Sequence, residues 1–408
     1  MTDKKSELSR RAFLYTSLGG IASVGALALG PRAIMAQEEG EAKSTPGGEA
    51  IYRTLGKTGM KIPIVSMGVM NANNPDIVQA SYDLGIRHFD TAARYAYGRN
   101  ELMVGNVLQK SGVRDKVIIA TKELRPAQRT RESLQQSKAK LIKLTEASLK
   151  RLKTDYIDIL YIHSVARAED LTNPGFLEAF TELKKQGKIR AAGVTTHENM
   201  ALVINEVVSQ GFFDVVLTAI NVAMVNNTAL LEAIASASSK GIGIIAMKTQ
   251  AGGSRLPEPE SLSDFSSTTV ATASLKWVMR NENITTAIPG FDNYQHMRED
   301  FSVARNLEYD DDEKKFLSDN RITLGMGFCH QCRKCEPTCP YNVDIPSLMR
   351  THMYAAQYAN FNEARVTLDD IAAGRGLRSC SSCTTCTALC TNHVNIPRRI
   401  ENLRTIYA

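Results

Sequence analysis

The sequence predicts a (β/α)8 barrel of the TIM type, an α/β fold, followed by a mainly helical C-terminal domain. Short apolar runs alternate eight times with longer amphipathic runs over roughly 250 residues, the length of such a barrel. All eight cysteines lie after residue 328, outside the barrel segment. The length of 408 residues also exceeds that of one typical domain.

The eight expected strands are short apolar runs, as buried parallel strands should be. They are residues 62–70, 85–92, 116–122, 156–163, 189–197, 213–222, 241–249 and 284–291. Amphipathic helix patterns lie between them, and several open on Asn as a helix cap and end near Gly. The clearest of these patterns are residues 74–85, 100–112, 173–188 and 227–241.

Residues 52–63, before the first strand, are expected to form a short hairpin that plugs the bottom of the barrel. The alternative fold is an open, doubly wound sheet. That fold would place a G-x-G-x-x-G turn after its first strand, and the sequence has no such motif there.

The first 36 residues predict an export signal and not part of the fold. Arg10 and Arg11 are adjacent, Phe13 and Leu14 follow, and a moderately apolar run continues to Gly30. This stretch resembles a twin-arginine export signal, which implies a periplasmic protein or one on the outer face of the cytoplasmic membrane. A retained membrane anchor is the alternative. We expect a signal peptide at 1–36, a linker at 37–50, the barrel at 51–310 and the C-terminal domain at 311–408.

The overall charge argues against one class of partner. The net charge is +6, and no long basic block with interleaved aromatic residues occurs. We therefore expect no nucleic-acid partner, and membrane contact only through the signal or anchor.

Four titratable side chains stand at the carboxyl ends of successive expected strands, where the active site of such a barrel lies. They are Asp90, Tyr95, Lys122 and His163. These residue types suit hydride transfer to a carbonyl, with Tyr95 protonating the developing alkoxide as general acid. We expect Lys122, held by Asp90, to lower the tyrosine pKa from its usual value of about 10. His163 would donate a hydrogen bond to the substrate oxygen.

Three segments carry a family resemblance. Phe89 to Gly105, Ala120 to Glu123 and Glu146 to His163 resemble the signatures of the aldo-keto reductases, in order along the chain. The resemblance spans about Tyr52 to Asn306. It implies an enzyme acting on a small carbonyl or alcohol, with its catalytic tetrad at the four side chains above. A barrel that kept these residues without activity is the alternative.

Two tyrosines compete for the catalytic position. Tyr97 lies directly before Gly98, and Tyr95 lies five residues after Asp90. The five-residue step favours Tyr95.

The same resemblance implies NAD(P)H bound across the rim without a Rossmann fold. The family usually holds the nicotinamide amide with a Ser-Asn pair after the fifth strand, where this chain has Thr195 and Thr196. The family's Gln in the sixth strand falls near the apolar Leu217.

The residues that would bind the phosphates are less complete. A 2′-phosphate is usually bound by Lys or Arg, but Gly290 and His296 stand near those positions, so the sequence does not select NADH or NADPH. "AMKTQAGG" is expected to cradle a pyrophosphate, with an ordinary turn as the alternative. The full candidate set for the cofactor is Gly68, Thr195, Thr196, Lys248, Gly252, Gly253 and Gly290.

The cysteines form an internal repeat, C-x2-C-x2-C-x3-C, each copy followed by a similar tail. The copies are Cys329, Cys332, Cys335 and Cys339, and Cys380, Cys383, Cys386 and Cys390. Disulfides are possible outside the cytoplasm, but cysteines three residues apart are poorly placed to pair. Zinc usually takes two C-x2-C pairs separated by a long loop. The spacing matches the bacterial ferredoxin pattern and predicts two [4Fe–4S] clusters.

The C-terminal segment resembles a two-cluster ferredoxin module, elaborated by a helical stretch between the two runs. The resemblance implies that the fourth cysteine of each run crosses over, so that Cys390 joins the first cluster and Cys339 the second. Arg333 and Lys334 lie inside the first run, where positive charge would raise the potential of its cluster; two solvated side chains are the alternative.

These features support an exported oxidoreductase whose barrel interconverts a carbonyl and an alcohol while the clusters exchange electrons with a redox partner. One alternative is an electron-transfer protein with a vestigial barrel site. Another is an enzyme whose clusters are only structural. Nicotinamide carries two electrons together and a [4Fe–4S] cluster carries one, so a direct link between them would need an intermediary such as a flavin.

Overall fold

The computed structural model describes residues 48–124, 132–251, 264–323, 327–380, 383 and 385–407. The predicted export signal and all but the end of the linker lie outside these residues. Within the described ranges, no helix is both long and apolar enough to cross a membrane.

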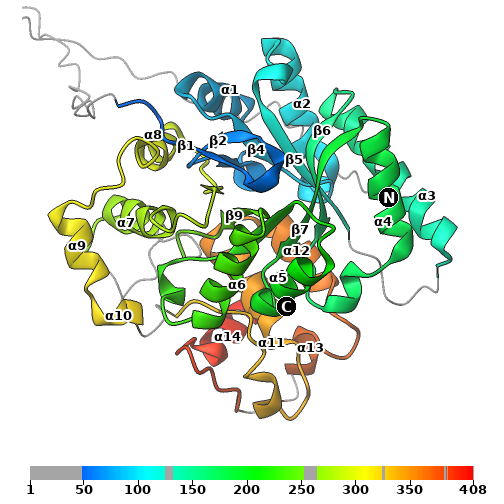
Figure 1. The fold of residues 1–408 in the computed structure, drawn as a ribbon. Coiled ribbons are helices and arrows are strands. Elements are labelled where there is room, and N and C mark those ends of the chain that lie inside the picture. Colours follow the sequence, from blue (N-terminus) through cyan, green and yellow to red (C-terminus); the bar gives the residue numbers. More distant parts are fainter. Residues whose placement is uncertain are drawn as a thin grey trace, which may run out of the picture. The chain divides into compact units, whose positions relative to one another are not determined.

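Eight parallel strands form one sheet, in the order in which they follow one another along the chain (Figure 1). They are β3 (Met67–Gly68), β4 (His88–Asp90), β5 (Ile118–Leu124), β6 (Ile157–His163), β7 (Ile189–Thr196), β8 (Val215–Ala219), β9 (Gly243–Met247) and β10 (Thr286–Ala287). A parallel bridge between Val65 and Ala287 joins the first and last strand regions. The predicted (β/α)8 barrel is therefore confirmed, and each strand falls inside its expected segment except β5, which continues two residues further to Leu124.

Helices follow the strands around the barrel: α1 (Pro75–Leu84), α2 (Arg99–Ser111), α3 (Leu134–Leu152), α4 (Pro174–Lys185), α5 (Met200–Gln210), α6 (Thr228–Ser239), α7 (Ser267–Met279) and α8 (Tyr294–Ser302). Asn74, Asn173 and Asn227 cap α1, α4 and α6, each accepting a hydrogen bond from a first-turn backbone N–H. Two shorter helices, α9 (Asp311–Leu317) and α10 (Asn320–Thr323), complete the barrel segment.

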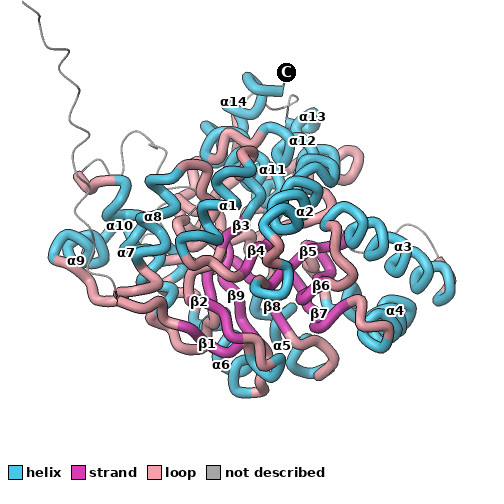
Figure 2. The backbone as a smooth tube through the Cα atoms, turned by 90° about the horizontal axis from the view of Figure 1, so that it is seen from above, coloured by secondary structure: helices cyan, strands magenta, loops and turns pink. Residues whose placement is uncertain are grey.

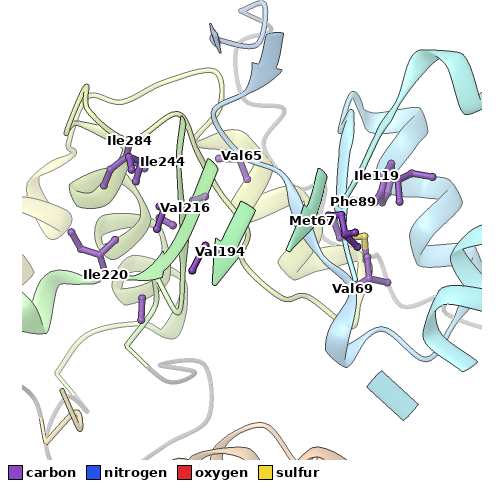
Figure 3. Packing of buried hydrophobic residues seen from close by; sticks show 14 of the residues in the cluster. Val65, Met67, Val69, Phe89, Ile119, Val194, Val216, Ile220, Ile244 and Ile284 are labelled. Atoms are coloured by element: carbon purple, nitrogen blue, oxygen red, sulfur yellow. The ribbon is translucent and has the colours of Figure 1, made fainter. Parts of the chain in front are cut away.

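The main hydrophobic core lies between the outer face of the sheet and these helices. Val194, Val216 and Ile244, from three neighbouring strands, are fully buried there (Figure 3). A second apolar cluster fills the barrel interior, and it includes Tyr161 and Leu217. Alternating side chains thus supply both layers, as the period of a strand requires.

A two-stranded hairpin closes the bottom of the barrel, as predicted from residues 52–63. Its antiparallel strands are β1 (Tyr52–Thr54) and β2 (Lys61–Pro63), and Leu55 between them is fully buried in the interior cluster. Gly56 has a φ of 48°, and a Cβ there would lie 2.3 Å from the carbonyl oxygen of Gly241. Only glycine fits this approach.

The C-terminal helices gather in one group (Figure 2): α11 (Ile345–His352), α12 (Phe361–Asp369), α13 (Leu377–Cys380) and α14 (Ile396–Tyr407). A π-helical turn, Met353–Gln357, ends α11. The helical stretch predicted between the cysteine runs is therefore present but broken. This domain has its own apolar core, to which several of the cysteines contribute.

Candidate functional site

Lys122 and Asp90 form a buried ion pair at the carboxyl ends of β5 and β4. The ammonium of Lys122 also donates to the carbonyl oxygen of Thr91, at 2.6 Å. Burial lowers the pKa of Lys122 and raises the pKa of Asp90. The attraction between the two charges works against both shifts. The pair that the sequence predicted is thus formed, out of contact with bulk water.

Tyr95 packs over this pair, with the Lys122 Nζ atom 5.1 Å from its ring centre. Burial, followed by the charges of Asp90 and Glu363, raises the pKa of Tyr95 well above its usual value. The expected lowering of this pKa is therefore wrong, because burial of much of the ring and the negative charges of Asp90 and Glu363 outweigh the positive charge of Lys122. Tyr95 keeps its proton.

His163 and Tyr97 lie differently from Tyr95. The His163 ring meets the Tyr95 ring edge to face, with centroids 6.0 Å apart. Burial and nearby positive charges, Arg94 first among them, lower the pKa of His163 well below its usual value, so its ring is neutral. Tyr97 is 70% exposed, with a left-handed φ of 56°. Of the two competing tyrosines, only Tyr95 stands beside the ion pair.

A cavity of about 220 Å³ opens beside these groups, and we call it the rim cavity. Asp90, Tyr95 and Lys122 line one side of it. Its other walls include two parts of the molecule: strand-end residues of the barrel, and four residues from the C-terminal domain, Tyr354, Gln357, Tyr358 and Ala359. The C-terminal domain therefore completes the cavity.

Polar contacts join the C-terminal domain to the barrel loops around this cavity. Arg94, just before Tyr95, forms ion pairs with Glu363 and Asp370 at 3.2 and 3.0 Å. The side-chain amide of Asn360 donates to Asn71, at 2.9 Å. These contacts hold α12 against the loops that follow β3 and β4.

The predicted nicotinamide clamp is not placed at the rim cavity. Thr195 accepts a hydrogen bond from the Ser164 N–H, and Thr196 donates one to the carbonyl oxygen of Glu198. Both threonines are buried, and neither lines the cavity. Their hydroxyl groups form hydrogen bonds with nearby backbone groups at the strand ends.

The other predicted cofactor positions divide into two groups. Gly68, Lys248 and Gly290 line the rim cavity, as does Leu217 at the position of the family's Gln. Gly252 and Gly253 lie outside the described residues. Residues 246–251 of the predicted pyrophosphate cradle are described, and Met247, Lys248, Thr249 and Gln250 of this segment line the rim cavity.

The eight thiols fall into two sets, which cross between the two cysteine runs. The thiols of Cys339, Cys383 and Cys386 help to raise the pKa of Cys380, and the four together line a cavity of about 160 Å³. We call these four the distal set. The other four we call the barrel-side set: Cys329, Cys332, Cys335 and Cys390.

The barrel-side set is also a spatial group. Burial, followed by the neighbouring thiols of Cys329, Cys390 and Cys332, raises the pKa of Cys335 to about 12. The exchange of Cys339 and Cys390 between runs is the arrangement expected from the sequence repeat.

The distal set fits a polynuclear cluster better than a single ion. Among the described residues, no three His, Cys, Asp or Glu side chains converge closely enough to hold one metal ion. The four distal thiols instead surround a cavity, whereas a single zinc ion would hold each sulfur at about 2.3 Å. Such a cavity, bounded by four thiols, suits a [4Fe–4S] cluster.

Comparison with known proteins agrees with this geometry. Residues 59–318, more than half of the chain, match the aldo/keto reductase family. The chain belongs to this family. Residues 328–395 of this aldo/keto reductase match the 4Fe-4S dicluster domain. The protein is therefore an oxidoreductase with a ferredoxin-type iron–sulfur domain at its C-terminal end.

Individual relatives of this aldo/keto reductase resemble its barrel. It is 27% identical over 287 residues to L-galactose dehydrogenase of Arabidopsis thaliana, covering 63% of this chain and 88% of the relative. It is 30% identical over 155 residues to aldo-keto reductase YhdN of Bacillus subtilis, covering 35% of this chain and about half (46%) of the relative. Aldo-keto reductase AKR11C1 from Bacillus halodurans, in its holo form, shares the fold, with a TM-score of 0.55 at 22% identity over 67% of this chain and 96% of that one.

Several residues of this aldo/keto reductase escaped the sequence analysis. Arg94, Tyr354 and Glu363 all stand around Tyr95, and Tyr354 lines the rim cavity. Arg94 directly precedes Tyr95 in the sequence, so its position beside the proposed general acid could have been predicted. Tyr354 and Glu363 lie in the stretch between the cysteine runs, where no motif marks them.

Proposed function

We propose that the protein interconverts a small carbonyl compound and its alcohol in the rim cavity, with Tyr95 as general acid. One observation carries this proposal: the half-buried, protonated phenol of Tyr95 lines the cavity beside the buried ion pair of Lys122 and Asp90. A general acid placed in this way contributes about 10²–10⁴-fold to the rate.

The surrounding residues favour proton donation in this geometry. When Tyr95 gives up its proton, the resulting phenolate lies beside the Lys122 ammonium, which stabilises it. Asp90 keeps that ammonium in place. The neutral His163 packs edge to face against Tyr95 but does not itself line the rim cavity, so it would support the phenol and not contact the substrate oxygen.

The size of the rim cavity favours a small substrate. A cavity of about 220 Å³ lies below the roughly 300–1,000 Å³ of ordinary ligand sites. L-Galactose and methylglyoxal are suitable probes, because one relative is named L-galactose dehydrogenase and another is the methylglyoxal reductase DkgB of Yersinia pestis.

We derive no step through a nicotinamide cofactor. The clamp expected at Thr195 and Thr196 is not formed, and the described residues supply Lys248 without the two glycines of the predicted cradle. An assay with each reductant in turn distinguishes use of NADH, of NADPH or of neither.

Two [4Fe–4S] clusters form the second part of the proposal. The barrel-side set and the distal set would each hold one, and each cluster when bound exchanges one electron at a time. A redox partner protein would supply or remove these electrons. The match to the dicluster domain and the crossed thiol sets support this part.

Export is the third part of the proposal. It rests on the resemblance of residues 9–14 to a twin-arginine signal and places the protein in the periplasm or on the outer face of the membrane. A cluster-bearing protein would be loaded and folded before such transport. Cell fractionation of the tagged full-length protein, with an Arg10→Lys, Arg11→Lys variant as control, tests this placement.

The enzymatic proposal is tested with full-length, cluster-loaded protein. A panel of small aldehydes, ketones and sugars is offered with NADH, with NADPH or with dithionite-reduced viologen, and product formation is followed. We expect turnover of at least one carbonyl. A protein that carries about eight irons and turns over none with any reductant would contradict the enzymatic reading and favour an electron-transfer protein with a vestigial site.

A further inference from the structure

The two thiol sets differ in their relation to the barrel. A second cavity, of about 30 Å³, is lined by Cys329 of the barrel-side set and by His197 and Lys248 of the barrel. We call it the junction cavity. Lys248 and Gln357 line both the junction cavity and the rim cavity. Two side chains, Lys248 and Gln357, are therefore common to the cavity beside Cys329 and to the cavity where we place the catalytic site.

The cavity of the distal set has no such connection. Every residue that lines it belongs to the segment between Cys339 and Arg404. The cavity of the distal set is thus lined by the C-terminal domain alone, whereas Cys329 of the barrel-side set lines a cavity shared with the barrel.

A hydrogen-bond chain ends on a thiol of the barrel-side set. The side-chain amide of Gln331, which is 5% exposed, donates to the Sγ atom of Cys329 at 3.2 Å and to the carbonyl oxygen of Pro346 at 3.0 Å. The guanidinium of Arg350 donates to the Oε1 atom of Gln331 at 2.9 Å. A positive charge therefore polarises an amide that donates one of its hydrogen bonds to the sulfur.

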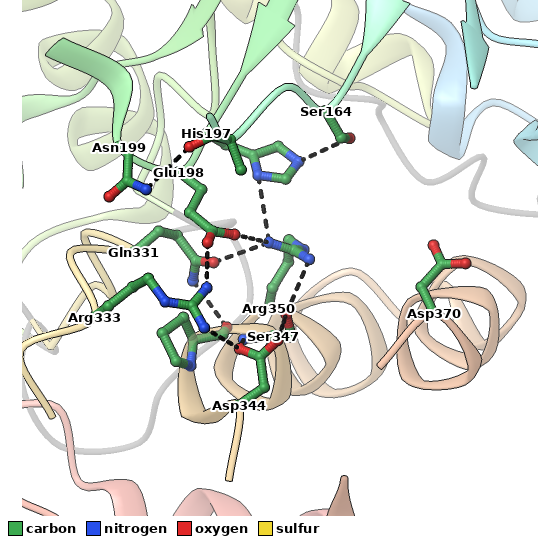
Figure 4. Close-up of polar contacts among 12 residues, drawn as sticks. Ser164, His197, Glu198, Asn199, Gln331, Arg333, Asp344, Ser347, Arg350 and Asp370 are labelled. Carbon is green, nitrogen blue, oxygen red and sulfur yellow. Dashed lines mark hydrogen bonds and ion pairs between the residues drawn. The ribbon is translucent and has the colours of Figure 1, made fainter. Parts of the chain in front are cut away.

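The same arginine reaches the barrel (Figure 4). Its Nη1 atom lies 3.4 Å from Nδ1 of His197, and His197 Nε2 lies 3.4 Å from the hydroxyl oxygen of Ser164. Ser164 directly follows His163. Arg350 thus bridges the strand ends of the barrel and the thiol of Cys329.

The charges around Arg333 largely cancel. This residue lies inside the first cysteine run, but it pairs with Glu198 and Glu336, and Asp344 is 3.8 Å away. Of the two residues expected to raise the potential of this cluster, Arg333 and Lys334, Arg333 is thus largely neutralised by carboxylates. Arg350 also lies 4.0 Å from Glu198, but unlike Arg333 it donates to the Gln331 amide that contacts the thiol of Cys329.

The distal set has an arginine of its own, differently placed. Arg404 donates to the backbone carbonyl oxygen of Cys380 and not to a side chain that contacts the sulfur. Glu401, one turn away, also lines the distal cavity. Among the described residues, Arg404 therefore acts on the Cys380 thiol through its charge, which Glu401 partly offsets, and not through a side-chain hydrogen bond to the sulfur.

We propose that the barrel-side set holds the cluster of higher reduction potential, and that Gln331 and Arg350 establish this order. Reduction adds one negative charge to a cluster, and hydrogen bonds and positive charge at its sulfurs stabilise that charge. A one-electron reductant would therefore lose one electron, and that electron would reside at the barrel-side set, nearest the rim cavity. No bond forms or breaks in this step.

This inference rests on the proposed presence of two clusters, so iron and sulfide are counted first. Full-length holoprotein is then titrated with dithionite, and the spectrum of each reduced cluster is followed by electron paramagnetic resonance. We expect two separate one-electron steps in the unchanged protein. Arg350→Met and Gln331→Leu should each lower the upper potential by about 59 mV or more, which is a tenfold fall in the reduced-to-oxidised ratio at a fixed potential.

Matched variants make the assignment specific. Gln331→Glu keeps the size of the side chain but removes its N–H donors, so it should lower the upper potential even if Gln331→Leu folds poorly. Arg404→Met is the control at the distal set, and it should leave the upper potential unchanged. The inference is overturned if Arg350→Met and Gln331→Glu leave the upper potential unchanged, if they shift the lower potential instead, or if Arg404→Met moves the upper one.

Failure of the premise gives a different result from failure of the inference. An iron count near four per chain would contradict the two-cluster proposal and remove this inference with it. Two clusters with unshifted potentials would overturn the inference alone. Carbonyl turnover, measured separately, bears on neither outcome.

Discussion

Arg94 of the barrel pairs with Glu363 of α12, with the two side chains 3.2 Å apart and only 13% and 8% exposed. Both residues contribute to the electrostatic surroundings of Tyr95. The pair therefore couples the position of the C-terminal domain to the phenol that we propose as the general acid.

Removing the negative charge of Glu363 should lower the free energy of unfolding. Glu363→Gln leaves the buried guanidinium of Arg94 with the exposed Asp370 as its remaining acid partner, so we expect a loss of about 3 kcal/mol in the free energy of unfolding. Urea unfolding followed by circular dichroism measures this. Asp370→Asn is the matched control and should cost at most about 1 kcal/mol, because Asp370 is exposed. Equal effects from the two variants would contradict this account of the interface.

Tyr354, which the C-terminal domain contributes to the rim cavity, should influence the pH dependence of carbonyl reduction. It lines the rim cavity, and its presence helps to raise the pKa of Tyr95. Tyr354→Ala would admit water and lower that pKa towards its ordinary value of about 10. Carbonyl reduction needs the protonated phenol, so activity would fall at a lower pH than in the unchanged protein.

The pH–rate profile for carbonyl reduction measures this shift. Tyr341, 45% exposed in the C-terminal domain, supplies the control variant Tyr341→Ala, whose profile should not change. A Tyr354→Ala profile that coincides with that of the unchanged protein would mean that Tyr354 does not influence the pKa of Tyr95.

His88 in β4 should make the fold sensitive to acid. It is fully buried, neither ring nitrogen has a partner among the described residues, and burial lowers its pKa to about 3. The unfolded chain binds a proton near pH 6.5 but the folded one does not, so stability is lost as the pH falls below 6.5. Between pH 7.5 and 5 this one residue should cost about 2 kcal/mol.

Unfolding free energies at these two pH values test the prediction. His88→Leu should remove about 2 kcal/mol of the difference between them, whereas the exposed His393, changed to Asn, should leave it intact. An unchanged pH dependence in His88→Leu would show that other groups cause the acid sensitivity.

The hairpin plug should contribute through Leu55. Its side chain is fully buried inside the barrel, so Leu55→Ala should lower the free energy of unfolding by about 3 kcal/mol. Ile51, at 37% exposure on the same segment, should cost less than about 1 kcal/mol when changed to Ala. Chemical denaturation distinguishes the two, and a small effect at Leu55 would argue against a packed plug.

Features with a local signal in the sequence could be predicted. The eight strands follow from apolar runs of the right length, and Asn74, Asn173 and Asn227 announce helix starts that the structure contains. The crossing of Cys339 and Cys390 was implied by the resemblance of the repeated cysteine runs to two-cluster ferredoxin modules. Asp90 and Lys122 were placed correctly because strand ends share one rim.

Features that depend on distant contacts could not be predicted. Arg350 and His197 are 153 residues apart in sequence, and nothing local marks either as a partner of the other. The raised pKa of Tyr95 depends on burial and on surroundings that include α12, which sequence spacing does not reveal. Thr195 and Thr196 stand at the expected positions, but their hydroxyls are used by neighbouring backbone groups.

The central claim is that Tyr95 donates the proton in a carbonyl reduction carried out by a cluster-bearing barrel. Tyr95→Phe and Tyr97→Phe are compared with the unchanged protein at equal iron content, using the carbonyl found in the panel. The account predicts a loss of about 10²–10⁴-fold in Tyr95→Phe, with unchanged clusters, and near-normal turnover in Tyr97→Phe. Normal turnover in Tyr95→Phe, or a loss confined to Tyr97→Phe, would contradict it.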